Sequence, residues 1–396
     1  MSTSPNFPLL YLPIIVLNQV LKLMTPFELI AVSLCSKTSK RLCKSIRSEI
    51  QCENAKDMFI MRYSTSTTVW LRFKYFPKIE WMFDVRKIPK EFKLRKPKKN
   101  FLHKILSLFR KKERKNEVTP TNIMNMFATD WTSSTEILPK ENVTIESLNM
   151  YCSEEPLAST INPGILYLSD IFNISMDHVE LHFQDFNREQ NERLIDFYKQ
   201  QNLRTLTLVG KRFNTAEDDK VLDYILCRQN PKLRLKLALE PTSEFRFKNE
   251  YFRNHTEVLE INNSQWIGMD DVLQLESLHI DLYKSKIESL AMKSLIQKWV
   301  DGWIPKWRTL MIEHPENVNI DLYVEEIVSG ENSNADVKSL RKEAATVNYV
   351  QHVLLRKDGH AAVVAVKDDK IGWFHVVEKV FQKDFLIDKI SEDDIG

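Results

Sequence analysis

A short apolar phrase recurs along the chain from about Val143 and restricts the possible folds more than any other feature. Its clearest copies are Ile145…Leu148-x-Met150, Met176…Val179-x-Leu181, Leu203…Leu206-x-Leu208, Leu275…Leu278-x-Ile280 and Trp307…Leu310-x-Ile312. Weaker copies are Leu235-x-Leu237-x-Leu239 and Leu259-x-Ile261. Alternating apolar positions predict strands with one face turned inward. A unit that recurs in this way predicts strands that stack beside one another in a repeating array.

Helical patterns separate several of these strands. They are Arg188 to Gln201, a segment capped by Thr215 with Asp218 three residues on, and a segment that begins at a Ser285–Glu288 capping box and ends at Gly302. Strand–helix alternation predicts parallel strands in an open, irregular solenoid. Start-to-start spacings of roughly 19 to 32 residues are close to those of leucine-rich repeats. A plain α/β sandwich is the alternative.

The C-terminal part has the pattern of an antiparallel meander. Tyr349 to Leu355 and Ala361 to Val366 alternate around Lys357-Asp358-Gly359, which is a strong hairpin signal. Gly372 to Val377 is a third candidate strand. We therefore expect a β-meander over residues 345–390.

The N-terminal stretch Phe7 to Ser45 predicts two or three short helices. Thr25 can cap a helix in which Pro26 takes the first position and Glu28 completes a capping box. The stretch carries more apolar residues in its roughly 40 positions than so small a segment can bury by itself. We therefore expect a partner protein to cover part of it.

This stretch closely resembles the F-box of nematode-type F-box proteins. The matching positions are Phe7-Pro8-Leu9-Leu10, Leu12-Pro13, Val20-Leu21…Met24, Pro26-Phe27-Glu28-Leu29-Ile30 and Ser33-Leu34-Cys35-Ser36-Lys37. Many F-boxes carry an acidic residue shortly after Leu-Pro, where this chain has Ile14-Ile15. The resemblance implies a surface for the Skp-type adaptor of cullin–RING ubiquitin ligases. The adaptor-binding residues that it implies are Leu9, Leu10, Leu12, Pro13, Val20, Leu21, Met24, Leu29, Ile30, Leu34 and Cys35. An ordinary buried helical hairpin is the alternative.

A second resemblance covers about Ile145 to Pro315, more weakly toward its start. Trp266, Asp270-Asp271-Val272-Leu273, Leu278-His279-Ile280, Leu295-Ile296-Gln297-Lys298-Trp299-Val300-x-Gly302 and Leu310-Met311-Ile312 look like the F-box-associated domain, type 2. That domain follows the F-box in the same nematode-type family. Lys293 stands where the pattern often has Asn.

The expected organisation has five parts. They are an F-box at 1–50, a short-strand connector at 51–85, a flexible basic linker at 86–135, an F-box-associated type 2, leucine-rich-repeat-like region at 143–328, and the meander at 345–390. The fold class is thus α+β or α/β, with a three-helix F-box, an irregular strand–helix solenoid and a C-terminal β-hairpin region. The linker is rich in Lys and Arg, and nuclear targeting or an anionic docking patch are its alternative roles.

No catalytic motif accompanies these features. The eight glycines are too widely spaced for a phosphate-binding loop. His178 and His182 fall on a predicted strand and lack further metal ligands, so we expect a structural or surface role for them. Trp299, Trp303 and Trp307 predict core packing rather than a ligand platform. We expect a non-catalytic protein with no cofactor and no metal.

Composition agrees with an intracellular interaction protein. The net charge is +2, and the five cysteines form no C-x-x-C pair, which suits a reducing cytoplasmic or nuclear compartment. We therefore expect a substrate-recognition subunit of an SCF-type ubiquitin ligase, which binds the Skp-type adaptor, through it a cullin, and an unknown protein substrate. Homo-oligomers, nucleic acid and membranes are not expected partners. The alternative is a non-ligase interaction protein whose basic linker binds nucleic acid or an anionic membrane.

Overall fold

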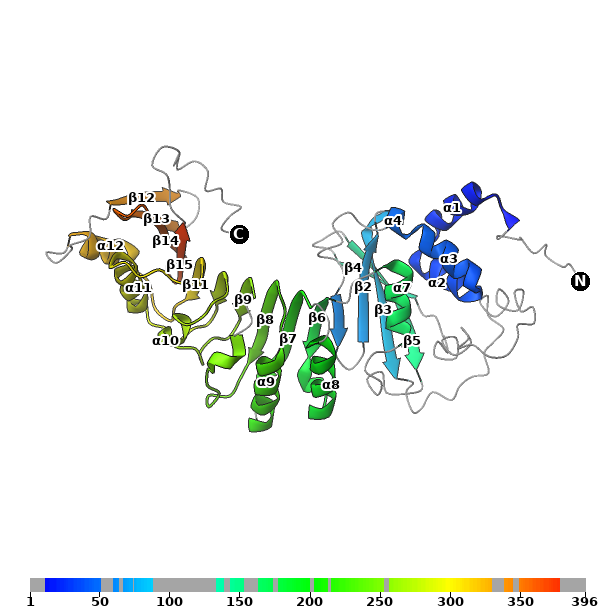
Figure 1. Ribbon diagram of the computed structural model, residues 1–396, viewed down its shortest axis with the longest axis horizontal. Helices are drawn as coiled ribbons and strands as arrows, with labels where there is room; N and C mark the ends of the chain where they lie inside the picture. The colour runs from blue at the N-terminus through cyan, green and yellow to red at the C-terminus, as the bar shows by residue number, and fades with distance from the viewer. Residues whose placement is uncertain are drawn as a thin grey trace, which may run out of the picture. The chain divides into compact units, whose positions relative to one another are not determined.

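The chain forms two compact units, Met1–Phe197 and Tyr198–Gly396. The computed structural model, drawn in Figure 1, describes residues 11–50, 60–63, 67–73, 75–87, 133–138, 143–152, 163–173, 177–199, 203–212, 215–252, 256–329, 338–344 and 349–377. The division falls inside the segment 143–328, which the sequence pattern predicts as a single domain, because the first strand of that segment pairs with strands that precede it. The two units are described separately below.

The first unit begins with the three expected helices, which confirms that part of the prediction. They are α1 (Ile14–Leu23), α2 (Pro26–Cys35) and α3 (Lys37–Ser45), followed by the short α4 (Arg47–Ile50). Buried apolar residues on all three helices form their shared core, namely Leu17, Leu21, Leu29, Ile30, Leu34 and Cys43.

The sheet of the first unit is mixed. Its strands are β1 (Ile60–Tyr63), β2 (Thr67–Phe73), β3 (Phe76–Lys87), β4 (Ser133–Leu138), β5 (Val143–Cys152) and β6 (His178–His182). The first three form an antiparallel meander, while β1 pairs in parallel with β6, and β3 in parallel with β5. The expected connector strands are therefore built into a sheet with β5, because their edges are completed by strands from later in the chain.

Both ends of the segment predicted as a basic linker belong to strands. β3 continues to Lys87, and β4 begins at Ser133 and pairs antiparallel with β5. The prediction of a linker over 86–135 was thus wrong at its ends, and residues 88–132 lie outside the described residues. The strand β4 was missed because its sequence, SSTEIL, lacks a run of apolar alternation.

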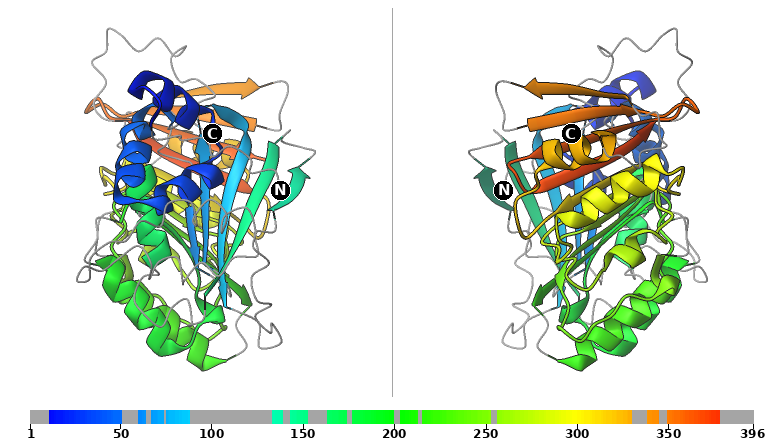
Figure 2. Two further views of the ribbon diagram at one scale, coloured as in Figure 1. Left: turned by 90° about the vertical axis from the view of Figure 1, so that its right-hand side faces the viewer. Right: turned by 90° about the vertical axis from the view of Figure 1, so that its left-hand side faces the viewer.

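Helices cover one face of this first sheet. Helix α7 (Pro163–Phe172) packs against α2 and α3. Figure 2 shows these helices on one side of the strands. Phe172 of α7 contacts Phe73 of β2, with ring centroids 5.2 Å apart. Aromatic side chains therefore fill the layer between the helices and the sheet.

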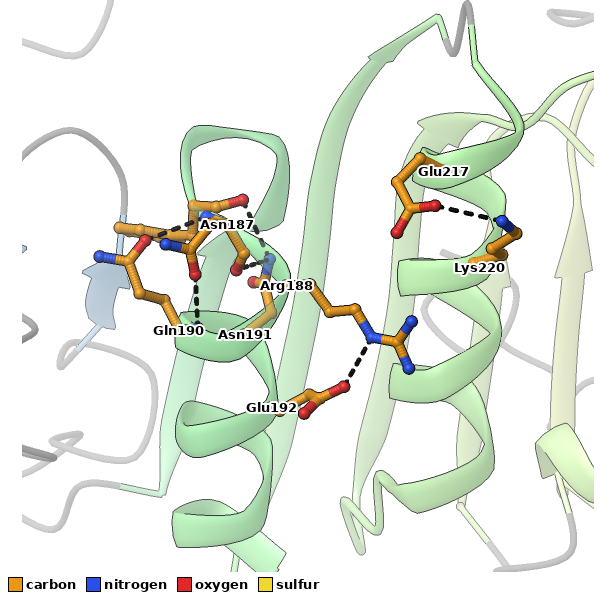
Figure 3. A network of polar contacts seen from close by, with 8 residues as sticks. Asn187, Arg188, Gln190, Asn191, Glu192, Glu217 and Lys220 are labelled. Atoms are coloured by element: carbon orange, nitrogen blue, oxygen red, sulfur yellow. Dashed lines mark hydrogen bonds and ion pairs between the residues drawn. The ribbon is translucent and has the colours of Figure 1, made fainter.

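The last helix that begins in the first unit is α8 (Arg188–Lys199), and the 3-10 turn Phe183–Asp185 precedes it. Asn187 caps it reciprocally: its Oδ1 accepts from the Gln190 N–H at 2.9 Å, and Gln190 Oε1 accepts from the Asn187 N–H at 3.0 Å (Figure 3). The buried Asn191 Nδ2 donates to the Phe183 carbonyl oxygen at 2.8 Å. Asparagine and glutamine therefore fix the start of this helix.

The second unit is built on parallel strands that the recurring phrase predicted. They are β7 (Thr205–Arg212), β8 (Arg234–Glu240), β9 (Val258–Ile261), β10 (His279–Leu282) and β11 (Thr309–Glu313). Each pairs in parallel with the next along the chain. Their alternating apolar residues form one fully buried face, which includes Leu208, Leu237, Leu259, Ile280 and Leu310.

An antiparallel meander extends the same sheet. The strand β15 (Ile371–Val377) pairs with β11, followed outward by β14 (Ala361–Lys367), β13 (Tyr349–Leu355) and β12 (Lys338–Ala344). The expected hairpin is present, with Gly359 at φ +85° in its turn. The meander begins before the predicted residue 345, because the charged sequence of β12, KSLRKEA, is typical of an exposed edge strand and carries a weak strand signal. Residues 378–390 of the predicted meander lie outside the described residues.

Helices α9 (Ala216–Arg228), α10 (Met269–Val272), α11 (Leu290–Val300) and α12 (Ile320–Ser329) connect strands of the second unit. Helices α11 and α12 pack together, and α12 packs on β12, β13 and β14 (Figure 2). The Thr215 cap of α9 is confirmed, since its side chain accepts from the Asp218 N–H, and a Glu217–Lys220 ion pair follows in the first turn (Figure 3).

The two ends of α11 test the sequence prediction separately. The Ser285–Glu288 capping box was wrong: Ser285 Oγ accepts from the Ile287 N–H, and Glu316 Oε1 from a distant loop accepts the Ser289 N–H at the true helix start. The Gly302 stop was right. Gly302 has φ +104°, and the N–H groups of Gly302 and Trp303 donate back to the carbonyls of Trp299 and Lys298.

Candidate functional site

Helix α1 presents apolar side chains to solvent. Its buried stripe is Leu17 and Leu21, which lie four residues apart on one face. The Ile14-Ile15-Val16 run turns through more than one face of a helix, so it cannot be buried with that stripe. The large apolar residues exposed on α1 and the turn before it are Tyr11 (88% exposed), Ile14 (56%), Ile15 (74%), Val16 (45%) and Leu23 (80%). This group is called the α1 apolar face below.

Helix α2, which follows α1, is fixed by its cap and by the sheet. The predicted capping box is confirmed: the Thr25 N–H donates to Glu28 Oε2 at 2.8 Å, and Thr25 Oγ1 accepts from the Glu28 N–H at 3.3 Å. Phe27, at the second helical position, contacts Trp81 and Phe83 of β3 edge-on, with centroid distances of 4.9 Å and 5.1 Å. Because α2 begins at a defined residue and is anchored by an aromatic ring, its position against the sheet is fixed.

Polar contacts anchor α2 and α3 to α7. Ser33 Oγ lies 2.9 Å from the Tyr167 hydroxyl, and both groups are buried. Asp170 accepts from Lys44 and from Lys40 at 2.7 Å, and Arg47 donates to its carbonyl oxygen at 2.9 Å. Burial alone would raise the pKa of Asp170, but hydrogen bonds from the two lysines outweigh it and lower that pKa. The carboxylate is therefore a charged anchor for α3.

The cysteines in these helices are poor nucleophiles. Burial raises the pKa of the Cys35 thiol to about 11 and that of Cys43 to about 12. Cys35 Sγ donates to the Ala31 carbonyl oxygen at 3.3 Å, and Cys43 Sγ donates to that of Leu29 at 3.5 Å. Both thiols remain protonated near neutral pH, so their role is packing.

The predicted adaptor-binding residues divide by exposure. Pro13 is exposed, and Leu12, Val20, Met24 and Cys35 are half-buried. Four others are 8% exposed or less and pack inside the chain, namely Leu21, Leu29, Ile30 and Leu34. In this structure those four support the surface instead of forming it. Leu9 and Leu10 lie outside the described residues.

Sequence reasoning gave less weight to the residues that are in fact exposed. The predicted adaptor-binding residues do not include Tyr11, Val16 or Leu23, and Ile14-Ile15 is noted only as a departure from a family pattern. The Ile14-Ile15-Val16 run itself indicates exposure, since three successive apolar residues cannot share one buried helix face.

Residues 9–51 match the F-box domain. No curated protein matches the chain. The helices α1 to α3, their shared core and the α1 apolar face all lie within the matched residues. The chain therefore carries an F-box domain at its N-terminal end.

Other residues that could have carried chemistry have structural partners. Glu180 accepts from Arg62 at 2.6 Å and lies 2.7 Å from His182 Nε2, which ties β6 to β1. Trp299 and Trp307 are buried against Phe374, with centroid distances of 6.3 Å and 5.8 Å. Within the described residues, no group of three His, Cys, Asp or Glu side chains could hold a metal. No described helix is long and apolar enough to cross a membrane.

Proposed function

We propose that the chain is a substrate-recognition subunit of an SCF-type cullin–RING ubiquitin ligase. Its F-box domain would bind a Skp-type adaptor, and through it a cullin, while the second unit would bind the protein to be ubiquitinated. The observation that supports this most is the α1 apolar face, a group of large apolar side chains left exposed within residues that match an F-box. Such patches on a folded domain mark sites of protein association.

In this proposal the chain contributes proximity rather than chemistry. It tethers a target beside a ligase, which raises the effective concentration of one for the other. The catalytic groups belong to other subunits, and we propose that this chain supplies none. An intracellular location follows from the same proposal, since the adaptor and cullin act there.

We also propose a finer family for the region after the F-box. The parallel strands β7 to β11, with helices between several of them, support an irregular leucine-rich-repeat-like build. The match of sequence patterns supports an F-box-associated domain of type 2 in a nematode-type F-box protein. A solved structure of a type 2 domain with a different strand order would contradict this assignment.

The adaptor interaction is tested by co-expression of the full chain with a Skp-type adaptor. We expect a stable complex, which Ile15→Glu weakens at least about tenfold because it places a charge in a desolvated apolar contact. Tyr75→Glu is the matched control. Tyr75 is also an exposed large apolar residue of the first unit, but it lies between β2 and β3, outside the F-box. The proposal fails if no complex forms, or if Ile15→Glu and Tyr75→Glu bind the adaptor equally well.

A further inference from the structure

The sheet of the second unit carries polar side chains on the face opposite to the buried leucine face. Strand register places side chains of neighbouring strands in rows across the sheet. One row runs through Lys236, Glu260, Asp281, Met311 and Trp373. This series is called the Asp281 row below. All of its residues lie in the second unit.

A groove of about 450 Å³ lies beside the Asp281 row, at the carboxyl ends of the parallel strands. Its lining includes Glu240, Glu260, Asn262, Tyr283 and Glu313. Tyr283 is two residues beyond Asp281 and therefore on the same face, roughly 7 Å further along the strand direction. The carboxyl edge of parallel strands is a common position for ligand sites in α/β proteins.

The cations next to the groove are mostly neutralised within the sheet. Glu260 accepts from Lys236 at 2.5 Å and lies 3.5 Å from Arg234 Nη2, and Arg212 lies 3.3 Å from Glu240. Lys284 has no ion pair with any described residue, but its side chain is exposed to water. The positive charges around the groove therefore do not require a partner.

Two of the acceptors, in contrast, lack a described hydrogen-bond donor. Asp281 is half-buried and has no hydrogen bond or ion pair to any residue that the structure describes. Burial and the neighbouring Glu260 raise the pKa of Asp281 to about 6, although Arg234 and Lys236 oppose the shift. Asn262 Oδ1 is buried without a described hydrogen-bond donor, and Glu313 Oε2 accepts the Lys284 backbone N–H.

Unsatisfied acceptors select an occupant that donates hydrogen bonds. A guanidinium or ammonium group supplies donors and positive charge together, and a guanidinium presents five N–H groups in a fixed plane. The Asp281 row also ends at an aromatic side chain: Trp373 is half-buried and follows the buried Met311 on the next strand. The aliphatic stem of a basic side chain packs well on such a surface, and a cation is attracted to an indole ring.

We propose that the Asp281 row and its groove bind an extended basic segment of the target protein, with an arginine or lysine side chain against Asp281. The inference rests on the proposed function, because it gives the second unit the role of target recognition. It names the chemistry of the recognised segment, which is cationic and donor-rich.

The test measures binding of the full chain to arrays of short synthetic peptides with mixed flanking residues. The central position is fixed as Arg, Lys, Glu or phosphoserine. We expect binding to the Arg and Lys pools to exceed binding to the Glu and phosphoserine pools at least about tenfold. Asp281→Asn should remove this preference, because a charged partner of the bound cation is lost. Glu288→Gln, at an exposed carboxylate before α11, is the matched control and should keep it.

Three outcomes overturn the inference: no preference among the pools, a preference for phosphoserine or Glu, or a preference that Asp281→Asn leaves intact. Adaptor binding measured on the same proteins separates this result from failure of the proposed function. Asp281→Asn should bind the Skp-type adaptor as the wild type does, which also shows that the variant is folded. Ile15→Glu should bind the adaptor at least about tenfold more weakly but retain the preference for Arg and Lys.

Discussion

The ring of Phe27 meets the ring of Trp81 edge-on, with centroids 4.9 Å apart and planes at 87°. Phe27 belongs to the F-box domain and Trp81 to β3, so the contact joins the F-box to the sheet of the first unit. The contacts of Tyr167 and Asp170 with α2 and α3 reinforce the same junction. The F-box is thus one part of a larger folded unit, in which α2 and α3 are held against β3 and α7.

Removal of the Phe27 ring should destabilise the first unit. Phe27→Ala leaves a cavity between α2 and β3, and we expect a loss of about 3 to 5 kcal/mol in the free energy of unfolding. Urea denaturation followed by tryptophan fluorescence measures it. Tyr75→Ala, at an exposed ring of the same unit, should change the free energy by less than about 0.5 kcal/mol. Equal midpoints for the two variants would contradict the described junction.

The capping box of α2 should contribute measurably to the stability of that helix. Thr25→Ala removes the acceptor for the Glu28 N–H, and we expect a loss of about 1 kcal/mol. Hydrogen exchange of the amides in α2 reports this directly, since their protection should fall. Thr38→Ala tests the same substitution at an exposed position inside α3, where alanine favours the helix. A comparable loss of protection in α3 from Thr38→Ala would argue against a specific cap.

The Asp170 anchor predicts weaker folding in acid. Its folded pKa lies below its unfolded value of about 3.9, so its contribution is present above that pH and is lost as the pH falls through the folded pKa. Asp170→Asn should lower the free energy of unfolding at neutral pH by less than about 1 kcal/mol, since the group is partly exposed. The difference from the wild type should vanish in strong acid. Asp185→Asn, at an exposed carboxylate of the same unit, is the matched control and should change the free energy of unfolding at neutral pH by less than about 0.5 kcal/mol.

Asp281 predicts the opposite pH dependence for the second unit. Its pKa is raised to about 6 in the folded chain, above an unfolded value of about 3.9. The folded state therefore binds the proton more tightly, and stability is lost as the pH rises from about 4 through about 6. Asp281→Asn should raise the free energy of unfolding near pH 8 by on the order of 1 kcal/mol. Little change is expected near pH 4. A variant that is less stable than the wild type near pH 8 would mean that Asp281 already has a stabilising partner.

Much of the fold could be predicted from periodicity. The strands β7 to β11 follow the recurring apolar phrase because one face of each is buried beneath helices. The strands β4 and β12 were not predicted, because they lie at sheet edges and have polar sequences. The start of α11 was mispredicted for another reason: the Ser289 N–H donates to Glu316, which is distant in sequence.

The sites were less predictable than the strands. The family resemblance located the F-box, but it could not separate Leu29 and Ile30, which are buried, from Ile15, which is exposed. That distinction depends on β3 and α7, which a local pattern does not contain. The sequence pattern likewise does not distinguish Asp281 from an ordinary polar residue of an alternating strand. Its unusual state arises from Glu260 on the neighbouring strand and from the lack of a described partner.

The link between Lys44 and Asp170 also has a consequence for synthesis of the protein, because 126 residues separate them in sequence. At roughly 5 to 20 residues per second, a ribosome needs on the order of 10 seconds to add that length of chain. During that interval the helices of the F-box have left the ribosome, while the helix that anchors them has not been made. A nascent chain therefore exposes the helices of its F-box before the helix that anchors them exists.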